Sequence, residues 1–213
     1  MAVAALLLLA TTGCQVTLVA RIQADADGTG EVQAGIGLDD GALAELGDPV
    51  TELRLDDLRQ AGWSVAGPAK EQDGLTWVRL AHRFESAAEA TRLAAQLGPP
   101  FRDLALTRKR TFLKSKTALT GLVDMSEGVA AFSDPGLQEA LAGVDLGPVT
   151  DESLRVRLEA SLHGRTRTWA PKVGEQVRVE AAAEVWNRRP VAAAVAALVF
   201  AVTGLVVFAA TRH

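Results

Sequence analysis

Cys14 is the single cysteine of the chain, so its thiol cannot form an intramolecular disulfide. It follows an apolar run at residues 2–10 and the small residues Thr11, Thr12 and Gly13. This order is typical of a secretory signal peptide that ends in a lipobox, where the cysteine is diacylated and becomes the mature N-terminus. We therefore predict lipidation of Cys14, although Thr11 replaces the usual leucine and no basic residue precedes the apolar run. The alternative is an uncleaved signal anchor in which Cys14 is only a small apolar residue.

A second group of residues suited to binding chemistry is a concentration of positive charge between positions 108 and 116. Its five members fall within nine positions and are called the basic cluster below; they are Arg108, Lys109, Arg110, Lys114 and Lys116. Ammonium and guanidinium groups contact anionic lipid headgroups, each contributing about 1 kcal/mol near the surface. A solvated strand edge that lysines guard against aggregation explains the pattern equally well. The basic cluster is therefore a candidate headgroup site with one open alternative.

Residues that could support catalysis are scattered along the sequence. It contains no Gly-x-Ser-x-Gly, no His-Glu-x-x-His and no phosphate loop. The acidic neighbours Asp39–Asp40 and Asp56–Asp57 are adjacent in sequence, which places the two carboxylates of a pair on different sides of a helix. His82 has no nearby His, Cys or paired carboxylate at ligand spacing, which favours a structural role for it. We expect no enzyme activity, no cofactor and no metal site.

The longest apolar stretch lies near the C-terminus, at residues 191–210. Its twenty residues carry no charge. At about 1.5 Å per residue, a helix of this length spans roughly 30 Å, the thickness of a bilayer core. We predict a transmembrane helix at 190–210. Trp186, Arg188 and Arg189 lie just before it and are expected to anchor at the membrane interface, where aromatic and basic residues collect.

The segment between these anchors is expected to form one extracytoplasmic domain. The predicted organisation is a signal peptide at 1–13, the domain at 14–189, the transmembrane helix at 190–210 and a short cytoplasmic tail at 211–213. The protein is thus expected in the cell membrane with a single span. Its formal net charge of −4 provides no overall positive field for nucleic acid. The expected partners are membrane lipids or lipoglycans, with envelope proteins as a second class.

Alternation of apolar and polar residues predicts the strands of this domain. Residues 16–22 and 32–38 alternate on either side of a turn rich in Gly and Asp, which predicts a hairpin. Ser86 and Glu89 form a capping box that begins a helix, and Gly98 ends it. The other expected elements, in chain order, are a helix within 39–62, strands at 63–66 and 75–84, a strand pair within 101–125, a helix beginning at 133, and closing strands at 154–160 and 177–183 joined by a polar connection at 163–174.

These elements predict an α+β domain with a mainly antiparallel sheet and about three helices packed on it. The anchors constrain it further, because Val16 lies two residues after Cys14 and Trp186 lies four residues before Pro190. If both anchors hold, the first and last strands should run antiparallel. The start of one and the end of the other would then lie on the membrane-proximal side.

Four features of the sequence resemble actinobacterial LppM-domain lipoproteins. They are Gly13–Cys14, the hairpin turn Asp-Gly-Thr-Gly at residues 27–30, the strand end Trp-Asn-Arg-Arg-Pro at residues 186–190, and a single terminal span. The resemblance covers nearly the whole chain. It implies an α+β domain of the cell envelope that binds lipids or lipoglycans such as phosphatidylinositol mannosides. It implies no catalytic set and carries over no ligand residues.

From the residues and the resemblance we expect a non-enzymatic envelope protein that binds a lipid or lipoglycan at the membrane surface. A structural protein that scaffolds other envelope components is the alternative. An apolar cavity between sheet and helices, with the basic cluster at its mouth, would favour lipid binding. A solid core with an exposed apolar patch would favour protein interaction.

Overall fold

A computed structural model of the protein describes residues 15–46, 55–127, 150–151 and 153–186. Three expected segments fall outside these residues: the signal peptide with Cys14, the helix beginning at 133, and the apolar stretch at 191–210. Within the described ranges, no helix is long and apolar enough to cross a membrane. The fold below is therefore that of the region between the two expected anchors.

The first two strands form the hairpin that the alternating sequence predicts. β1 (Val16–Ala24) pairs antiparallel with β2 (Gly30–Leu38). Gly28 turns the chain between them with a φ of 97°, in the left-handed region that favours glycine. The even-numbered residues of both strands, among them Ile22 and Val32, face the core, and the odd-numbered ones face the other way.

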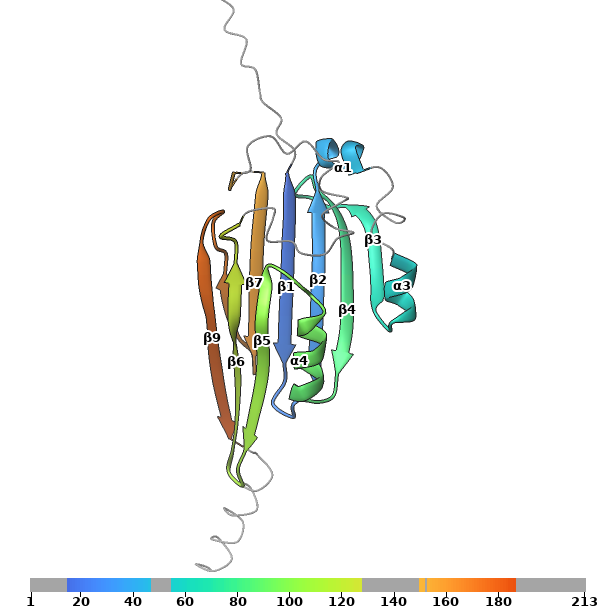
Figure 1. Ribbon diagram of the computed structural model, residues 1–213. Coiled ribbons are helices and arrows are strands. Elements are labelled where there is room, and N and C mark those ends of the chain that lie inside the picture. Colours follow the sequence, from blue (N-terminus) through green and yellow to red (C-terminus); the bar gives the residue numbers. More distant parts are fainter. Residues whose placement is uncertain (1–14, 47–54, 128–149, 152, 187–213) are drawn as a thin grey trace, which may run out of the picture.

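Six strands make the larger sheet, in the order β3-β4-β2-β1-β7-β8 (Figure 1). The added strands are β3 (Ser64–Lys70), β4 (Thr76–Phe84), β7 (Leu154–Leu162) and β8 (Arg165–Trp169). The neighbours are antiparallel except β1 and β7, which run parallel, so the sheet is mixed. The polar connection expected at 163–174 contains a strand, β8. It is a short edge strand exposed along most of its length, so its sequence lacks the apolar alternation that identifies a strand.

A second, three-stranded sheet has the order β5-β6-β9 and is antiparallel throughout. It consists of β5 (Phe101–Arg110), β6 (Lys114–Asp124) and β9 (Gln176–Trp186). Together with helix α4 (Ala87–Ala95) it covers one face of the six-stranded sheet (Figure 1). The domain is α+β as expected, but strands make up most of the layer that was expected to be helical.

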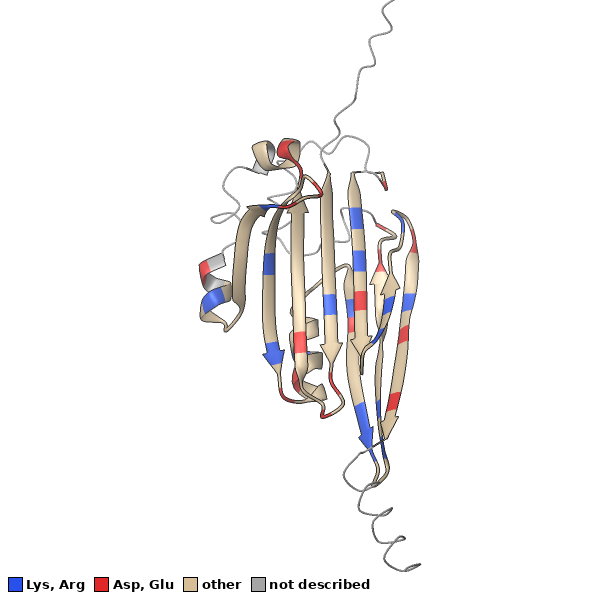
Figure 2. Ribbon diagram, turned by 180° about the vertical axis from the view of Figure 1, so that it is seen from behind, with Lys and Arg blue, Asp and Glu red and all other residues tan. Residues whose placement is uncertain are grey.

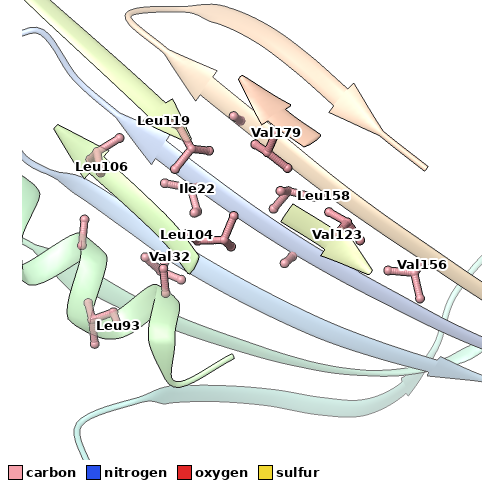
Figure 3. Close-up of a cluster of buried hydrophobic side chains, with 14 of the residues drawn as sticks. Ile22, Val32, Leu93, Leu104, Leu106, Leu119, Val123, Val156, Leu158 and Val179 are labelled. Atoms are coloured by element: carbon pink, nitrogen blue, oxygen red, sulfur yellow. The ribbon is translucent and has the colours of Figure 1, made fainter. Parts of the chain in front are cut away.

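The core fills the space between these two layers (Figure 3). Ile22 and Leu158 come from the six-stranded sheet, Leu119 and Val179 come from the three-stranded sheet, and each of the four is 0 % exposed. Leu93 brings α4 into the same cluster. Burying a side chain of this size contributes about 1.5–3 kcal/mol. The apolar interface between the layers is therefore the main interaction that holds the two sheets together.

Helix α4 begins where its sequence predicts. The Ser86 hydroxyl accepts a hydrogen bond from the Glu89 N–H at 3.3 Å, and the Glu89 carboxylate accepts one from the Glu85 N–H at 2.8 Å. This confirms the cap, with the return bond one residue earlier than in the usual capping box. The Thr91 hydroxyl accepts a hydrogen bond from the Leu106 N–H at 3.0 Å and so fastens the helix to β5.

The single helix expected within residues 39–62 is two helices, α1 (Asp40–Leu46) and α3 (Leu55–Gln60). α1 begins after Asp39, whose carboxylate accepts the Ala42 N–H at 2.7 Å. It lies beside the end of β2, and α3 lies beside β3 at the edge of the sheet (Figure 1). Of the described helices, α4 alone packs across the sheet face.

β1, β7 and β9 run in the same direction (Figure 1). β1 therefore begins at one end of the domain, called the far end, whereas β9 ends at the other, called the tip end, where the β5–β6 hairpin also turns. A strand of nine residues separates the two ends by about 30 Å. The expectation that the first and last strands run antiparallel between anchors on one side is wrong. The reason is that β9 pairs with β6 in the second sheet and not with β1.

Candidate functional site

The β5–β6 hairpin turns at residues 111–114, called the tip turn below. The Thr111 N–H donates to the Lys114 carbonyl at 2.8 Å, and the Lys114 N–H donates to the Thr111 hydroxyl at 3.1 Å. Phe112 and Leu113 occupy the positions between them and are 73 % and 41 % exposed. Short turns normally place Gly, Asn, Asp, Ser or Pro at such positions. Two large apolar residues at the outermost point of a hairpin therefore need an explanation beyond the turn itself.

Trp186 lies beside the tip turn because of strand pairing. The β6–β9 register places it opposite Lys114, whose ammonium lies 4.6 Å from the centroid of the indole ring. The Trp186 side chain is 60 % exposed. Phe112, Leu113 and Trp186 are the exposed large apolar residues of the described chain, and all of them lie at the tip end. Single exposed apolar residues are ordinary in soluble proteins, but a group of them at one end indicates a contact surface.

The basic cluster surrounds this apolar group. Lys109, Arg110 and Lys116 are exposed, and Lys109 lies directly opposite Lys116 across the β5–β6 ladder. Lys114 forms an ion pair with Glu184 at 2.6 Å, and its hydrogen bond and charge hold the pKa of Glu184 below the ordinary value. Figure 2 shows basic residues at the lower end of the three-stranded sheet. The structure thus brings together the basic cluster and the predicted interface tryptophan, which the sequence analysis treated separately.

Arg108 differs from the other members of the basic cluster. Its side chain is half-buried, with Nη2 donating to the Ala26 carbonyl at 2.8 Å and Nε donating to the Ser115 hydroxyl at 3.0 Å. It lies against Gly28, where an added Cβ would come within 2.6 Å of its Nη1. The positive φ favours glycine at position 28, and a larger residue there would also require the Arg108 side chain to shift. Arg108 fastens the three-stranded sheet to the β1–β2 turn, so its charge is directed into the domain.

A polar pair lies near Arg108. Nε2 of His163 lies 2.9 Å from the Thr117 hydroxyl, and Nδ1 is buried with no hydrogen-bond partner in the described chain. Burial, and then the nearby Arg108 charge, lower the pKa of His163. The imidazole is therefore neutral at physiological pH and adds no charge to the basic cluster.

Two grooves lie on the open face of the six-stranded sheet, on the side away from the three-stranded sheet. The larger, about 440 Å³, is lined by Trp77, Thr17 and Arg157 among others. The smaller, about 200 Å³, is lined by Gly35 and Arg79 among others. The Arg79 guanidinium lies 4.3 Å from the centroid of the Trp77 ring and Trp77 is buried, so the indole offers little free surface to a ligand. Neither groove includes the basic cluster, and neither matches the cavity expected between sheet and helices.

Three residues assigned from the sequence lie outside the described chain. They are Cys14, expected to be lipidated, and Arg188 and Arg189, expected to anchor at the interface. Within the residues that the structure places, no group of three His, Cys, Asp or Glu side chains could hold a metal ion. The candidate site therefore consists of the tip turn, Trp186 and the outward-facing members of the basic cluster.

Phe112 and Leu113 are the site residues that sequence reasoning missed. Neighbouring apolar residues in a strand-like stretch are ordinarily core residues, so alternation alone did not identify them. The signal that could have found them is the turn required between two adjacent antiparallel strands. A polar or glycine-rich pair is expected there, and Phe-Leu stands in its place.

No family model matches the chain, and no curated protein matches it. Among solved structures, its fold is similar to the NMR structure of the folded domain of LppM from Mycobacterium tuberculosis. The two share 14 % sequence identity with a TM-score of 0.47, over 84 % of this chain and 94 % of that one. The similarity is distant and concerns the course of the chain alone. It shows neither membership of a family nor a function.

Proposed function

We propose that this protein is a membrane-anchored, extracytoplasmic protein of the cell envelope that binds a lipid or lipoglycan at the membrane surface and catalyses no reaction. The observation that carries the proposal is the composition of the tip end. Exposed apolar side chains lie there among exposed basic ones, and Trp186 precedes the uncharged stretch at 191–210 by five positions. Aromatic, aliphatic and basic residues in this mixture are typical of proteins that sit at a membrane interface.

The packed interior supports recognition at the surface and not in a pocket. Ile22, Leu119 and Leu158 leave no exposed area between the sheets. An acyl chain could enter there only by displacing core side chains, which costs about 1–3 kcal/mol or more. A headgroup that contacts the basic cluster from outside requires no such displacement.

Native mass spectrometry of the full chain, released from detergent, tests the proposal. Wild type is compared with a tip variant and with a control variant that removes the same charge elsewhere. The tip variant is Lys109→Gln, Arg110→Gln, Lys116→Gln, and the control is Arg155→Gln, Arg157→Gln, Arg178→Gln. We expect wild type and control to retain a lipid or lipoglycan from the host membrane and the tip variant to lose it. Equal retention by the three proteins, or none by wild type, would contradict the proposal.

A structural protein that scaffolds other envelope components is the second candidate. The solid core with an exposed apolar patch is the arrangement expected of a protein that binds protein partners, and it also fits a membrane surface. The basic residues around the patch, and its position next to residues 191–210, favour the lipid. An envelope protein that co-purifies with wild type in place of a lipid, and is lost in the Phe112→Ser variant, would favour scaffolding.

A further inference from the structure

We infer that the tip turn inserts into a membrane containing anionic lipids and holds the domain upright, with the far end directed away from the bilayer. The inference rests on the proposed function in that it requires a lipid surface as partner. The inference goes beyond the proposed function in two respects: the tip turn is the part of the domain that enters the lipid surface, and the domain therefore stands upright on it.

The order of residues along the hairpin is that of an element inserted at an interface. Phe112 and Leu113 stand outermost, and cationic groups follow within two residues on either side, at Arg110 and Lys114. In such an order the apolar side chains enter the acyl region while the charged groups remain at the level of the headgroups. Trp186 stands opposite Lys114 on the neighbouring strand. Its ring, apolar with one polar N–H, favours the same boundary.

Chain continuity places the tip end near the expected span. β9 ends at Trp186, and the uncharged stretch begins at residue 191. Five residues extend over about 18 Å at most. A span at 191–210 therefore keeps the tip end close to the bilayer whatever path the connecting residues take.

The far end carries exposed carboxylates among basic residues: Asp40 forms an ion pair with Lys70, and Arg155 is exposed near the start of β7. Asp40, Asp73 and Asp151 are exposed there, and Figure 2 shows acidic residues in α1 and the neighbouring turns. Anionic headgroups repel carboxylates and attract the basic cluster. A domain lying on its side, with both ends on the membrane, is disfavoured for this reason.

The upright orientation separates the two anchors that the sequence predicts. Val16 begins β1 at the far end, roughly 30 Å from the tip end. Cys14 lies two residues before it, and two residues reach about 7 Å at most. An acylated Cys14 and a span at 191–210 therefore do not enter the same face of one membrane while the tip turn is inserted.

Quenching of tryptophan fluorescence by brominated lipids measures this insertion directly. The full chain is reconstituted into vesicles of phosphatidylcholine and phosphatidylglycerol in equal parts, brominated on the acyl chains, and wild-type emission is subtracted. Phe112→Trp places a reporter at the tip turn. Gln72→Trp places a matched reporter in the exposed turn between β3 and β4 at the far end. We expect the tip reporter to lose most of its added emission and the far-end reporter to keep nearly all of it.

Equal quenching of the two reporters would overturn the inference. A high equal level would mean that the domain lies flat, and a low equal level would mean that the tip turn stays in water.

The double variant Phe112→Ser, Leu113→Ser should reduce the quenching of Trp186 without lowering the unfolding temperature. Equal quenching in a protein that still retains a lipid in native mass spectrometry rejects the inference alone. A clear difference between reporters with no retained lipid rejects the proposed function alone.

Discussion

At the far end, where β1 begins, carboxylates are bound into the fold, whereas at the tip end basic side chains extend away from it. The Asp39 carboxylate accepts the Gln15 N–H at 2.8 Å and the Ala42 N–H at 2.7 Å. The Asp73 carboxylate accepts the indole N–H of Trp77 at 3.0 Å. These bonds satisfy backbone donors next to β1 and in the first turn of α1, and the indole N–H of Trp77, so these far-end carboxylates stabilise the fold.

At the tip end most exposed basic side chains have no ion-pair partner within the described domain. Lys116 nevertheless stands opposite Glu184, and its charge, after the Lys114 hydrogen bond and charge, helps to lower the pKa of Glu184. Among the described residues, Lys109, Arg110 and Lys116 form no ion pair, while Lys114 pairs with Glu184. Arg108, in the same run of sequence, is directed inward and hydrogen-bonded. Basic residues of one short run thus have two roles. Arg108, whose hydrogen-bond acceptors lie within the domain, stabilises the fold, and the exposed members are available for binding.

Asp39→Ala tests the role of the far-end carboxylates and should have the largest effect on stability. Loss of the carboxylate leaves the Gln15 and Ala42 N–H groups without an acceptor, which should lower the free energy of unfolding by about 2 kcal/mol. Thermal and urea unfolding of the full chain in mild detergent, followed by tryptophan fluorescence, measures the change. Asp40→Ala is the control, since the ion pair with Lys70 is exposed and contributes less than about 1 kcal/mol. Equal stability of the two variants would contradict the claim that the Asp39 carboxylate stabilises the far end.

Arg108→Gln tests whether Arg108 stabilises the fold while its neighbour Lys109 contacts the membrane. The variant loses the hydrogen bonds to Ala26 and Ser115 and should unfold with a free energy lower by about 1–2 kcal/mol. Lys109→Gln removes the same charge one residue further along. It should leave the free energy of unfolding unchanged and weaken the contact with anionic vesicles. The reverse pattern would show that Arg108, and not its neighbour, faces the membrane.

Local patterns were sufficient for much of the fold. The β1–β2 hairpin, β4 and the start of α4 were predicted because alternation, turn residues and capping act between near neighbours. The pairings between strands distant in sequence were not predicted, since alternation identifies the buried face of a strand and not its neighbour. The parallel pairing of β1 with β7 and the pairing of β6 with β9 both join strands distant in sequence. The first pairing places β7 in the six-stranded sheet, and the second places β9 in the three-stranded sheet.

The site shows the same division between local and distant information. The basic cluster and Trp186 were predicted separately as membrane contacts, and those roles remain predictions. Their proximity depends on the register that sets Lys114 opposite Trp186, which no local pattern encodes. The inward direction of Arg108 likewise depends on how the two sheets pack, because its acceptors belong to the β1–β2 turn and to β6.

Acid should weaken the far end through Asp124, which ends β6 there. Its carboxylate accepts the Ser126 hydroxyl at 2.6 Å and the Gln176 amide at 3.2 Å, and these hydrogen bonds, first those from Ser126, hold its pKa below the ordinary 3.8. A carboxyl whose folded-state pKa is depressed stabilises the protein above its unfolded-state pKa, and this stability is lost as the pH falls through the folded-state value. We expect the unfolding temperature of wild type to fall more steeply below about pH 4 than that of Asp124→Asn. Parallel pH profiles would show that this carboxylate does not stabilise the far end.

Glu184→Gln should have the smallest effect on stability. It tests whether charge at the tip end affects membrane contact without stabilising the fold. The Lys114 hydrogen bond and charge lower the pKa of Glu184, but an exposed pair contributes little to stability, so the unfolding temperature at neutral pH should not change measurably. The substitution still raises the net positive charge beside the tip turn, which should increase the quenching of Trp186 by brominated anionic lipids at low salt. Glu180→Gln, on the same strand but further from the tip, is the control and should show a smaller effect. A fall in unfolding temperature like that of Asp39→Ala would mean that charge stabilises the tip end as it stabilises the far end.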